Sequence, residues 1–280
     1  KLSINNNFSD YYFNSDETLN HNSFKSNVLI SSDLQFSKIG ITSPKVKFIF
    51  PIQIENSDKT INEESNSITF NYHNQFSDNR FFGNDLFDSS PRVVYGLENY
   101  IFSDNAEISF KINQSFDANI NNNYLEKVNE TSRLSDYAIE SALKYDEIYF
   151  KIDARLDNDN FSKKEMNYEL KFNKKFEGSL IYNETQAEAF KDLSKDTQSI
   201  VLDITRKFKN NINISFNSNL DVKNNYDPYK SKFKISLFDD CSQLDISYSN
   251  TRFNDNFNTQ PEEKISLTFN CENILPAVGQ

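Results

Sequence analysis

The sequence contains few cysteines and histidines, which limits the chemistry it can support. Cys241 and Cys271 are the only cysteines in 280 residues, too few for a disulfide scaffold or a zinc site. His21 and His73 are the only histidines, and a hydrolase triad would need one of them beside a nucleophile. His73 alternates with Tyr72 in an apparent strand, so we expect a polar wall residue there rather than a catalytic base.

Glycine and proline are also scarce, with 5 and 6 residues. No Gly-rich loop of the kind that binds phosphate is present. Asparagine takes the place of glycine in the expected turns, because it adopts the left-handed backbone conformation more readily than most side chains. No cofactor is therefore expected.

Long apolar runs are absent as well. No stretch of about 18 apolar residues exists, which excludes a transmembrane helix. Mean hydropathy is −0.69, as in soluble or disordered chains, yet 26 Phe and 14 Tyr are too many for disorder. An aromatic-rich chain of low hydropathy is typical of a transmembrane β-barrel, because only alternate strand residues meet lipid.

Acidic residues outnumber basic ones by 41 to 30, which gives a net charge of −11. This balance argues against nucleic-acid binding, which needs a basic surface. No loop has the ligand spacing of a calcium site. The carboxylate pairs fall in expected loops or turns, where we interpret them as solvated rather than as acid–base catalysts. These pairs are Glu63-Glu64, Asp239-Asp240 and Glu262-Glu263. The sequence thus predicts no catalytic or metal-binding residue, and we expect no enzyme.

Alternation of apolar and polar residues predicts the fold class: an all-β, antiparallel transmembrane β-barrel of roughly fifteen strands, forming one domain over residues 1–280. The alternation is regular from Ala106 onward. Residues expected on the apolar face there include Ile108, Phe110, Ile112, Phe116, Tyr137, Ile139, Phe172, Phe176, Ile204, Phe216, Phe233 and Tyr248.

The chain before residue 106 is less regular. We expect a strand at 2–13, a loop at 14–23, and extended segments at 24–38 and 45–55. Pro44 and Pro51 lie in or beside the last segment, where proline predicts an edge, a bulge or a distortion.

Three further segments have specific expectations. Ile68, Phe70 and Tyr72 alternate as in a strand, which a polar loop and a second extended run from Arg92 follow. Residues 117–133 are expected to form a long polar loop, and residues 186–193 one or two helical turns.

The connections alternate between short and long. Short turns are expected near Asn105, Glu147, Lys174, Asn210 and Asp240. A β-sandwich has no reason to sort its loops in this way, whereas membrane barrels have short periplasmic turns and longer external loops. The sequence therefore predicts periplasmic short turns and a last strand that runs toward the periplasm.

Residues 62–102 carry a specific motif. The segment contains Asn62-Glu63-Glu64-Ser65, then Asn79-Arg80-Phe81 with Gly83 and Asp85, then Arg92 and Tyr95-Gly96-Leu97. It resembles the outer-membrane LPS-assembly protein family (LptD, also called OstA), in which an Asn-Glu-Asp-Ser-like segment precedes N-R-[FY]-x-G-x-D-R and R-x-x-Y-G-L. Leu86 stands where that family usually has Arg.

Later segments also resemble the family. Ser135-Asp136-Tyr137 is similar to its S-D motif, and Asp239-Asp240-Cys241 followed by a strand and Arg252 is similar to its C-terminal region. The segment from Lys264 to Cys271 is similar to the closing strand. The family barrel is about twice as large, and the chain begins at Lys1 without a signal peptide. We therefore expect the C-terminal part of the barrel, without the N-terminal periplasmic domain.

The resemblance implies a function and partners. The family barrel transports lipopolysaccharide (LPS) and inserts it into the outer leaflet of the Gram-negative outer membrane. The implied partners are LPS, an LptE-like lipoprotein plug, and a periplasmic LPS-bridge protein that binds the N-terminal domain. The loop at 79–85 falls on the external side, and one hypothesis folds it inward to support the plug.

The resemblance also implies roles for C-terminal residues. The last strand would form one side of a lateral gate, with Ile265, Ser266, Leu267, Thr268 and Phe269. Inward-facing candidates for contact with the plug or with sugars are Ser266, Thr268, Ser247 and Asp245. Cys241 would form a disulfide with a cysteine of the N-terminal domain. A Cys241–Cys271 pair is the alternative, and it requires Cα atoms within about 7 Å.

Two other classes of protein remain open from the sequence. A general outer-membrane porin or an autotransporter-type barrel would show the same alternation without the 62–102 motif. A soluble β-rich adhesin would be extracted without detergent.

Overall fold

A computed structural model describes most of the chain. It covers residues 2–13, 19–31, 34–37, 40–53, 69–81, 88, 90–120, 123–174, 176–208, 211–223, 227–239, 242–251 and 262–271. Side chains are described from residue 40 on, except at 52, 53, 123, 227 and 271.

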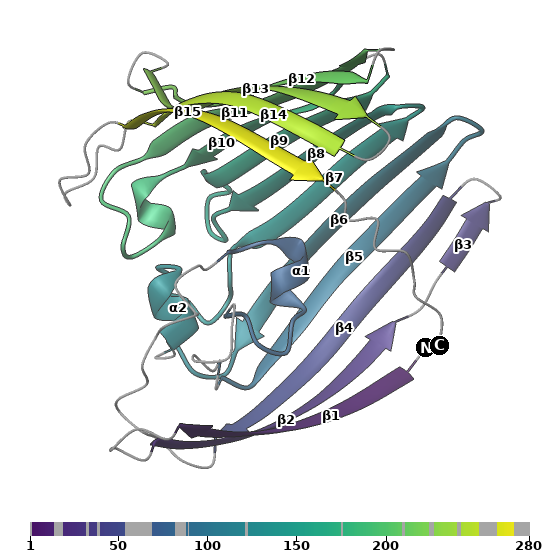
Figure 1. Ribbon diagram of the computed structural model, residues 1–280. Coiled ribbons are helices and arrows are strands. Elements are labelled where there is room, and N and C mark those ends of the chain that lie inside the picture. Colours follow the sequence, from purple (N-terminus) through teal and green to yellow (C-terminus); the bar gives the residue numbers. More distant parts are fainter. Residues whose placement is uncertain are drawn as a thin grey trace, which may run out of the picture. The chain divides into compact units, whose positions relative to one another are not determined.

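Antiparallel strands make up most of the structure (Figure 1). Their hydrogen-bonded order in the 15-stranded sheet follows the chain from β1 to β15, with β3 beside β4 off this path. The expected all-β antiparallel fold is confirmed. The strands are β1 (Leu2–Phe13), β2 (Leu19–Ser31), β3 (Leu34–Ser37), β4 (Gly40–Gln53), β5 (Arg92–Phe102), β6 (Ala106–Asp117), β7 (Tyr137–Tyr145), β8 (Ile148–Leu156), β9 (Lys163–Asn173), β10 (Glu177–Thr185), β11 (Thr197–Phe208), β12 (Ile212–Asp221), β13 (Asp227–Asp239), β14 (Ser242–Thr251) and β15 (Glu262–Cys271).

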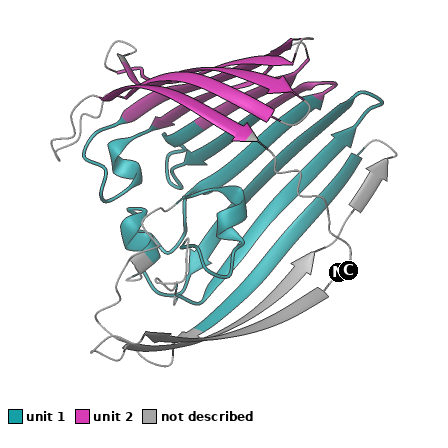
Figure 2. Ribbon diagram, viewed as in Figure 1, with its two compact units in different colours: residues 1–144, 151–166, 185–196 teal, residues 145–150, 167–184, 197–280 magenta. Residues whose placement is uncertain are grey.

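The chain divides into two compact units (Figure 2). Unit 1 comprises residues 1–144, 151–166 and 185–196, and unit 2 comprises residues 145–150, 167–184 and 197–280. Unit 1 holds the short helices α1 (Tyr72–Gln75) and α2 (Asn123–Lys127) and the 3-10 turn η1 (Ala187–Ala189). None of the helices in the described ranges is long and apolar enough to cross a membrane.

The two faces of the sheet in unit 1 differ in chemistry. In β5, Tyr95 and Leu97 are exposed, whereas Val94 and Glu98, which come before and after this pair, are buried. In strand β6, exposed Phe110 likewise lies on one face, and buried polar residues lie on the other face. Side chains of successive strand residues point to opposite faces, so one face is apolar and exposed, and the other is polar and covered.

Unit 2 repeats this division in its registers. The apolar residues Ile204, Phe216, Phe233, Tyr248 and Ile265 are paired in turn from β11 to β15 and form one continuous row. One residue away, a polar row runs across the same strands on the other face. It consists of Thr205, Ser215, Lys234, Ser247 and Ser266.

The prolines of β4 lie where that strand has a single neighbour. Pro44 pairs with Leu97 of β5, between the point where β3 pairing ends and the point where β2 pairing begins. Pro51 pairs with Lys25 of β2, beyond the end of the β5 pairing. Proline donates no backbone hydrogen bond, and positions with a single neighbouring strand are those where a sheet tolerates it. The strand as a whole is not an edge strand.

Short turns use residues that tolerate positive φ. Asp146 between β7 and β8 has φ 55°, and Asn211 before β12 has φ 54°. Asn and Asp are enriched in this conformation, so the expected use of Asn in turns is confirmed at Asn211.

Three expectations about connecting segments are wrong. Tyr72 lies in helix α1 rather than in a strand, because the Asn71 side chain accepts a hydrogen bond from Asn74 N and caps the helix. Residues 117–133 contain α2 and a buried apolar cluster rather than a polar loop. Strand β2 begins at Leu19, so it takes in part of the expected 14–23 loop. The helical turn expected within 186–193 is present as η1.

An apolar core lies in unit 1 between these connecting segments and the sheet. Its members come from the segments before β5, between β6 and β7, and from β7 itself. They are Phe70, Phe81, Tyr124, Leu125, Val128 and Ala138, with Phe190 packed against them. The connecting segments therefore form a folded layer over the polar face of unit 1.

Candidate functional site

Helix α1 is attached to the polar face of the sheet by side-chain contacts from both β5 and β6. The Tyr72 hydroxyl donates to Glu98 Oε1 of β5 over 2.9 Å. Asn113 Nδ2 of β6 donates to the Tyr72 carbonyl over 2.7 Å. Burial and the neighbouring Glu98 carboxylate raise the pKa of Tyr72, so the hydroxyl remains a donor.

Gly96 makes the second of these contacts possible. It pairs directly with Asn113 across the β5–β6 register. A Cβ at Gly96 would lie 2.6 Å from the Ile112 carbonyl oxygen and 2.9 Å from Asn113 Cβ. The motif glycine therefore leaves room for the Asn113 side chain to reach the Tyr72 carbonyl.

The motif arginine Arg80 is at the centre of a buried ion cluster. Its Nε donates to Asp88 Oδ2 over 2.6 Å, and its Nη2 donates to Asp117 Oδ1 over 2.6 Å. Arg92 Nη1 lies 2.8 Å from Asp88 Oδ2. All of these side chains except that of Asp117 belong to the 79–92 motif region, and none of the four has exposed surface.

The cluster is electrically balanced, because two arginines face two aspartates. Buried charges are costly unless they are paired and hydrogen-bonded. Burial alone would raise the pKa of Asp88, but Arg80 and Arg92 outweigh this effect and lower it. The carboxylate is therefore ionised and holds both guanidinium groups.

The side chains of Asn79 and Asn74 hold the backbone around Arg80 in place. Asn79 Oδ1 accepts a hydrogen bond from Asp88 N over 3.1 Å, which fixes Asp88 beside Arg80. Asn74 Nδ2 donates to the carbonyls of Thr69 and Arg80 over 2.6 and 2.9 Å. The Arg80 guanidinium also lies 4.0 Å from the centroid of the Tyr124 ring, a favourable cation–π contact. Arg80 thus joins the α1 segment, the α2 segment and strand β6.

A second buried arginine, Arg155 of β8, joins the remaining segments. Its guanidinium donates to the carbonyls of Val128 and Ala189, both over 2.7 Å. It also donates to Asp136 Oδ2 over 2.7 Å and to Glu130 Oε1 over 3.0 Å. The planar five-donor group of arginine suits such a divided set of acceptors.

Acidic groups around Arg155 exceed its single charge. Lys164 Nζ lies 2.9 Å from Asp136 Oδ2 and supplies a second cation. Burial raises the pKa of Glu130 to about 7, and the nearby Asp136 carboxylate adds to this effect while Arg155 opposes it. Glu130 therefore titrates near neutral pH.

The Arg155 site packs on the same apolar core as the Arg80 site. The Arg155 guanidinium lies 4.4 Å from the centroid of the Phe70 ring and 5.7 Å from that of Phe190. We define the two-arginine anchor as Arg80 and Arg155 with their carboxylates Asp88, Asp117, Asp136 and Glu130. The anchor fixes the connecting segments of unit 1 to the wall of the sheet.

The structure places several motif residues in this anchor or next to it. Arg80 and Arg92 are in the ion cluster, Asn79 supports it, Phe81 is in the apolar core, and Gly96 admits Asn113. The other motif and disulfide candidates lie outside the described residues. They are Asn62, Glu63, Ser65, Gly83, Asp85 and Cys241, together with Glu64, Leu86, Asp240 and Arg252. His21 lies in β2, where the backbone alone is described.

Sequence reasoning missed Asp88, Asp117 and Arg155. Asp88 lies within the motif loop eight residues after Arg80, and no motif position singled it out. Asp117 and Arg155 lie at strand positions whose partners are far away in the chain. The available signal was a single arginine near the end of an expected strand, and this signal did not identify the residues that bind the arginine.

Other candidates have ordinary surroundings. His73 lies in α1, not in a strand, and its exposed ring is 3.1 Å from Glu140. Asp239, Glu262 and Glu263 belong to strands rather than to loops, which corrects the expectation for them. Within the part of the chain that the structure describes, no group of three or more His, Cys, Asp or Glu could hold a metal ion.

The last strand, β15, pairs with β14 and stands at the end of the strand order. Ile265, Leu267 and Phe269 on one face are 80, 70 and 65% exposed. On the other face, Ser266 pairs with Ser247, and Thr268 pairs with Asp245. The four inward-facing candidates therefore form one compact polar patch across β14 and β15.

An antiparallel sheet with an exposed apolar face and a polar face covered by its own loops defines a protein of the outer-membrane β-barrel class. The chain belongs to the LptD family, whose family model, LPS transport system D, matches residues 9–220. The expected resemblance is confirmed, and the chain is an outer-membrane protein of the LPS transport system.

Comparisons with other proteins add less. No curated protein matches the chain. Among solved structures, the Salmonella typhi OmpF complex with daunomycin is 7% identical with a TM-score of 0.30, covering 91% of this chain and 90% of that one. A triple mutant of the Rhodopseudomonas blastica porin is 10% identical with a TM-score of 0.34, covering 95% and 99%. Scores this low carry no argument about function.

Proposed function

We propose that the chain is the C-terminal part of the barrel that inserts lipopolysaccharide into the outer leaflet. The family match supports this most strongly, because it includes the motif loop and both arginines of the anchor. The short turns would face the periplasm, as in other membrane barrels. An LptE-like plug and a periplasmic bridge protein would act with it, and Cys241 would pair with a cysteine of the N-terminal domain.

The two rows of β14 and β15 suit a cargo with sugars at one end and acyl chains at the other. The polar patch of Ser247, Asp245, Ser266 and Thr268 would contact sugars or the plug. The exposed Ile265, Leu267 and Phe269 would contact acyl chains. A strand at the end of a sheet has unpaired backbone groups, so it is the natural position for a gate in a membrane sheet.

The two-arginine anchor has a supporting role in this proposal. It holds the α1 and α2 segments against the polar face of unit 1, so that they remain in place while polar cargo passes. No covalent bond is made or broken in such transport, and the protein acts as a transporter rather than as an enzyme.

In-cell photo-crosslinking of the full-length protein tests the proposal. A photoreactive residue would replace Ser266, Leu267, Thr268 or Phe269 in turn, and Phe216, in the central strand β12 of unit 2, would be the control position. We expect LPS adducts at the β15 positions that disappear when periplasmic LPS supply is blocked, and none at the control. A correctly inserted barrel without LPS adducts on β15 would contradict the proposal and favour a general porin.

A further inference from the structure

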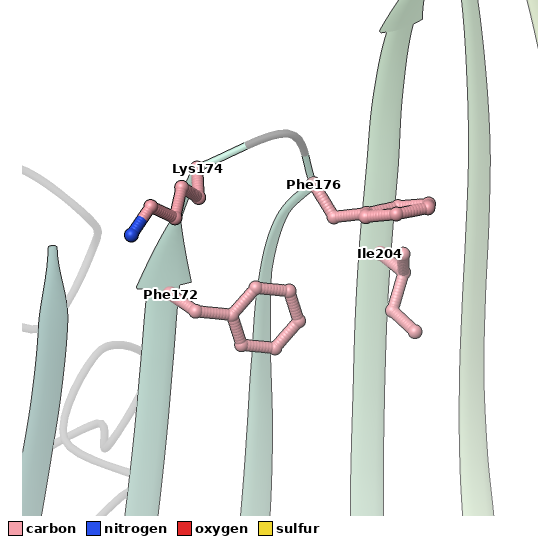
Figure 3. Close-up of a pocket in the computed structure, with 4 residues that line it drawn as sticks. All are labelled: Phe172, Lys174, Phe176 and Ile204. Carbon is pink, nitrogen blue, oxygen red and sulfur yellow. The ribbon is translucent and has the colours of Figure 1, made fainter.

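A notch in the apolar face of unit 2 lies where β10 has no side chain. Phe172 of β9, Phe176 before β10, Ile204 of β11 and the turn residue Lys174 line a cavity of about 530 Å³ (Figure 3). A Cβ at Gly178 would lie 2.9 Å from Phe172 Cζ and 3.2 Å from Ile204 Cα. Gly178 therefore forms the floor on which the Phe172 ring and Ile204 lie.

Almost the whole lining of the notch is apolar. Water gains nothing in an apolar cavity, because it needs two or more polar partners. In an outer-membrane sheet this face meets lipid, so an acyl chain is the natural occupant. The volume is within the range of about 300–1,000 Å³ that small-molecule sites have.

Two cations lie at the edge of the sheet that is next to the notch, and one of them, Lys174, lines it. Lys174 is in the turn after β9, and Arg206 is two residues before the end of β11. Because adjacent strands are antiparallel, the ends of β9 and β11 are at one edge of the sheet. Figure 3 shows the Lys174 ammonium pointing away from the aromatic rings, so its charge is outside the apolar part.

Arg206 is unusual because it is a charged residue on the apolar face of the sheet. Its guanidinium lies 4.9 Å from the centroid of the Phe176 ring and 4.7 Å from that of Phe208. Among the described residues no carboxylate pairs with Lys174 or Arg206, whereas the next residue, Lys207, pairs with Glu177 over 2.7 Å. Arginine on a lipid-facing surface is tolerated near the membrane interface, where phosphate groups are available.

We propose that this notch binds one anionic glycerophospholipid of the periplasmic leaflet, with an acyl chain against Phe172, Phe176 and Ile204 and the phosphate at the short-turn edge, within reach of Lys174 and Arg206. Bidentate contact with arginine and point-charge contact with lysine are the usual modes of phosphate recognition. The choice of leaflet rests on the proposed orientation, in which the short turns face the periplasm. The site is separate from the β15 gate in sequence and in chemistry.

Photolabelling of the full-length protein with its partner proteins tests the site. The complex would be placed in nanodiscs of phosphatidylethanolamine with a minority of phosphatidylglycerol that carries a photoreactive acyl chain. We expect adducts on the peptides that contain Phe172, Phe176 or Ile204. The Lys174→Gln, Arg206→Gln double variant should reduce them roughly thirtyfold, because each basic residue near anionic lipid contributes roughly a fivefold effect.

Two further variants separate lipid binding from general damage. Ile204→Trp should fill the notch and abolish its adducts, while Ile246→Trp, on the same face of β14, should not. Lys207→Gln is the matched control for Arg206→Gln, because its side chain is on the other face and is paired with Glu177. Equal labelling in all variants would overturn the proposal.

The source of the lipid is tested with a second probe. Stronger labelling by photoreactive lipid A than by phosphatidylglycerol would assign the notch to LPS and overturn the phospholipid proposal. LPS crosslinking at Ser266 and Leu267 is measured separately in the same variants. Loss of notch labelling with normal LPS adducts on β15 supports the lipid site, whereas absence of β15 adducts in the unmodified protein contradicts the transport proposal alone.

Discussion

Arg80 Nη2 and Asp117 Oδ1 are 2.6 Å apart and neither side chain has exposed surface, so a loop residue and the last residue of β6 share a buried ion pair. Asp88 holds the same guanidinium from within the loop. Removal of one member of such a set leaves an uncompensated buried charge. The anchor is therefore expected to be far more sensitive to single substitutions than exposed ion pairs are.

Substitution of Arg80 tests this sensitivity. Arg80→Gln leaves Asp88 and Asp117 without their shared cation and should lower the free energy of unfolding by roughly 3–5 kcal/mol. The measurement is the denaturant midpoint of the full-length protein in detergent, combined with limited proteolysis of the 69–81 segment. We expect cleavage there to increase before the sheet unfolds.

The control for Arg80→Gln is Lys191→Gln. Lys191 forms an ion pair with Glu126 on the surface of the same unit, and exposed pairs of this kind contribute little. We expect no measurable change in midpoint. If both variants behave alike, burial of the Arg80 cluster does not determine its importance.

The close approach of Gly96 to Asn113 leads to a second prediction. Gly96→Ala places a methyl group 2.9 Å from Asn113 Cβ, and overpacking of this kind costs roughly 1–3 kcal/mol. Asn113 would then lose its contact with the Tyr72 carbonyl. A double-mutant cycle with Asn113→Ala, read as the change in unfolding free energy, should show that the two effects are not additive. Full additivity would show that Gly96 acts independently of Asn113.

The geometry around Arg155 predicts that a positive charge alone is not enough to hold the connecting segments in place. Arg155→Lys keeps the charge but cannot reach the carbonyls of both Val128 and Ala189 together with Asp136. We expect faster hydrogen exchange in the 187–193 segment, nearly as fast as in Arg155→Gln. Rescue of slow exchange by lysine would contradict the proposed division of donors among the three segments.

Glu130 predicts a pH dependence of stability. Its pKa of about 7 in the folded protein is above its ordinary value of 4.5, so the folded state binds the proton more tightly than the unfolded state does. The resulting stability is complete below pH 4.5 and is lost as the pH rises through 7, with a slope on the order of 1 kcal/mol per pH unit. Asp88 has a lowered pKa, so its contribution to stability is lost only when the pH falls below the ordinary pKa of an aspartate.

The Glu130→Gln variant isolates this contribution. Glutamine resembles the protonated acid, so the variant should be more stable than the natural protein at pH 8 and equally stable at low pH. Denaturant midpoints over a pH series provide the measurement. A constant difference between the two proteins at all pH values would show that Glu130 does not titrate in this range.

The strands could be predicted from the sequence because alternation is a local signal. Phe233 and Ile235 indicate their face without knowledge of their neighbours, and both lie in β13 as expected. The strand begins at Asp227, however, within the loop that the pattern predicts at 223–231. Tyr72 shows the limit of this signal. Ile68, Phe70 and Tyr72 alternate, but the cap at Asn71 and the burial of Phe70 in the core impose a helix instead.

The anchor could be predicted only in part. The family resemblance singled out Arg80 and Arg92 in the motif, but it did not identify the residues that pair with them. Asp117 and Glu130 looked like members of a solvated loop, because nothing in the local pattern indicates that α2 and its flanks fold back onto β6 and β8. Contacts between distant segments depend on tertiary packing, which periodicity does not encode.

The strand order has a consequence for biogenesis. Since every strand after β4 pairs with its predecessor in the chain, the sheet can grow hairpin by hairpin as the polypeptide arrives. The layer of connecting segments over the polar face of unit 1 cannot be completed in this way. Arg155 binds the carbonyls of Val128 and Ala189, so the contact that joins the α2 segment to the η1 segment forms only after β10 has been delivered. A chain arrested before that point would leave this layer incomplete and accessible to quality-control proteases.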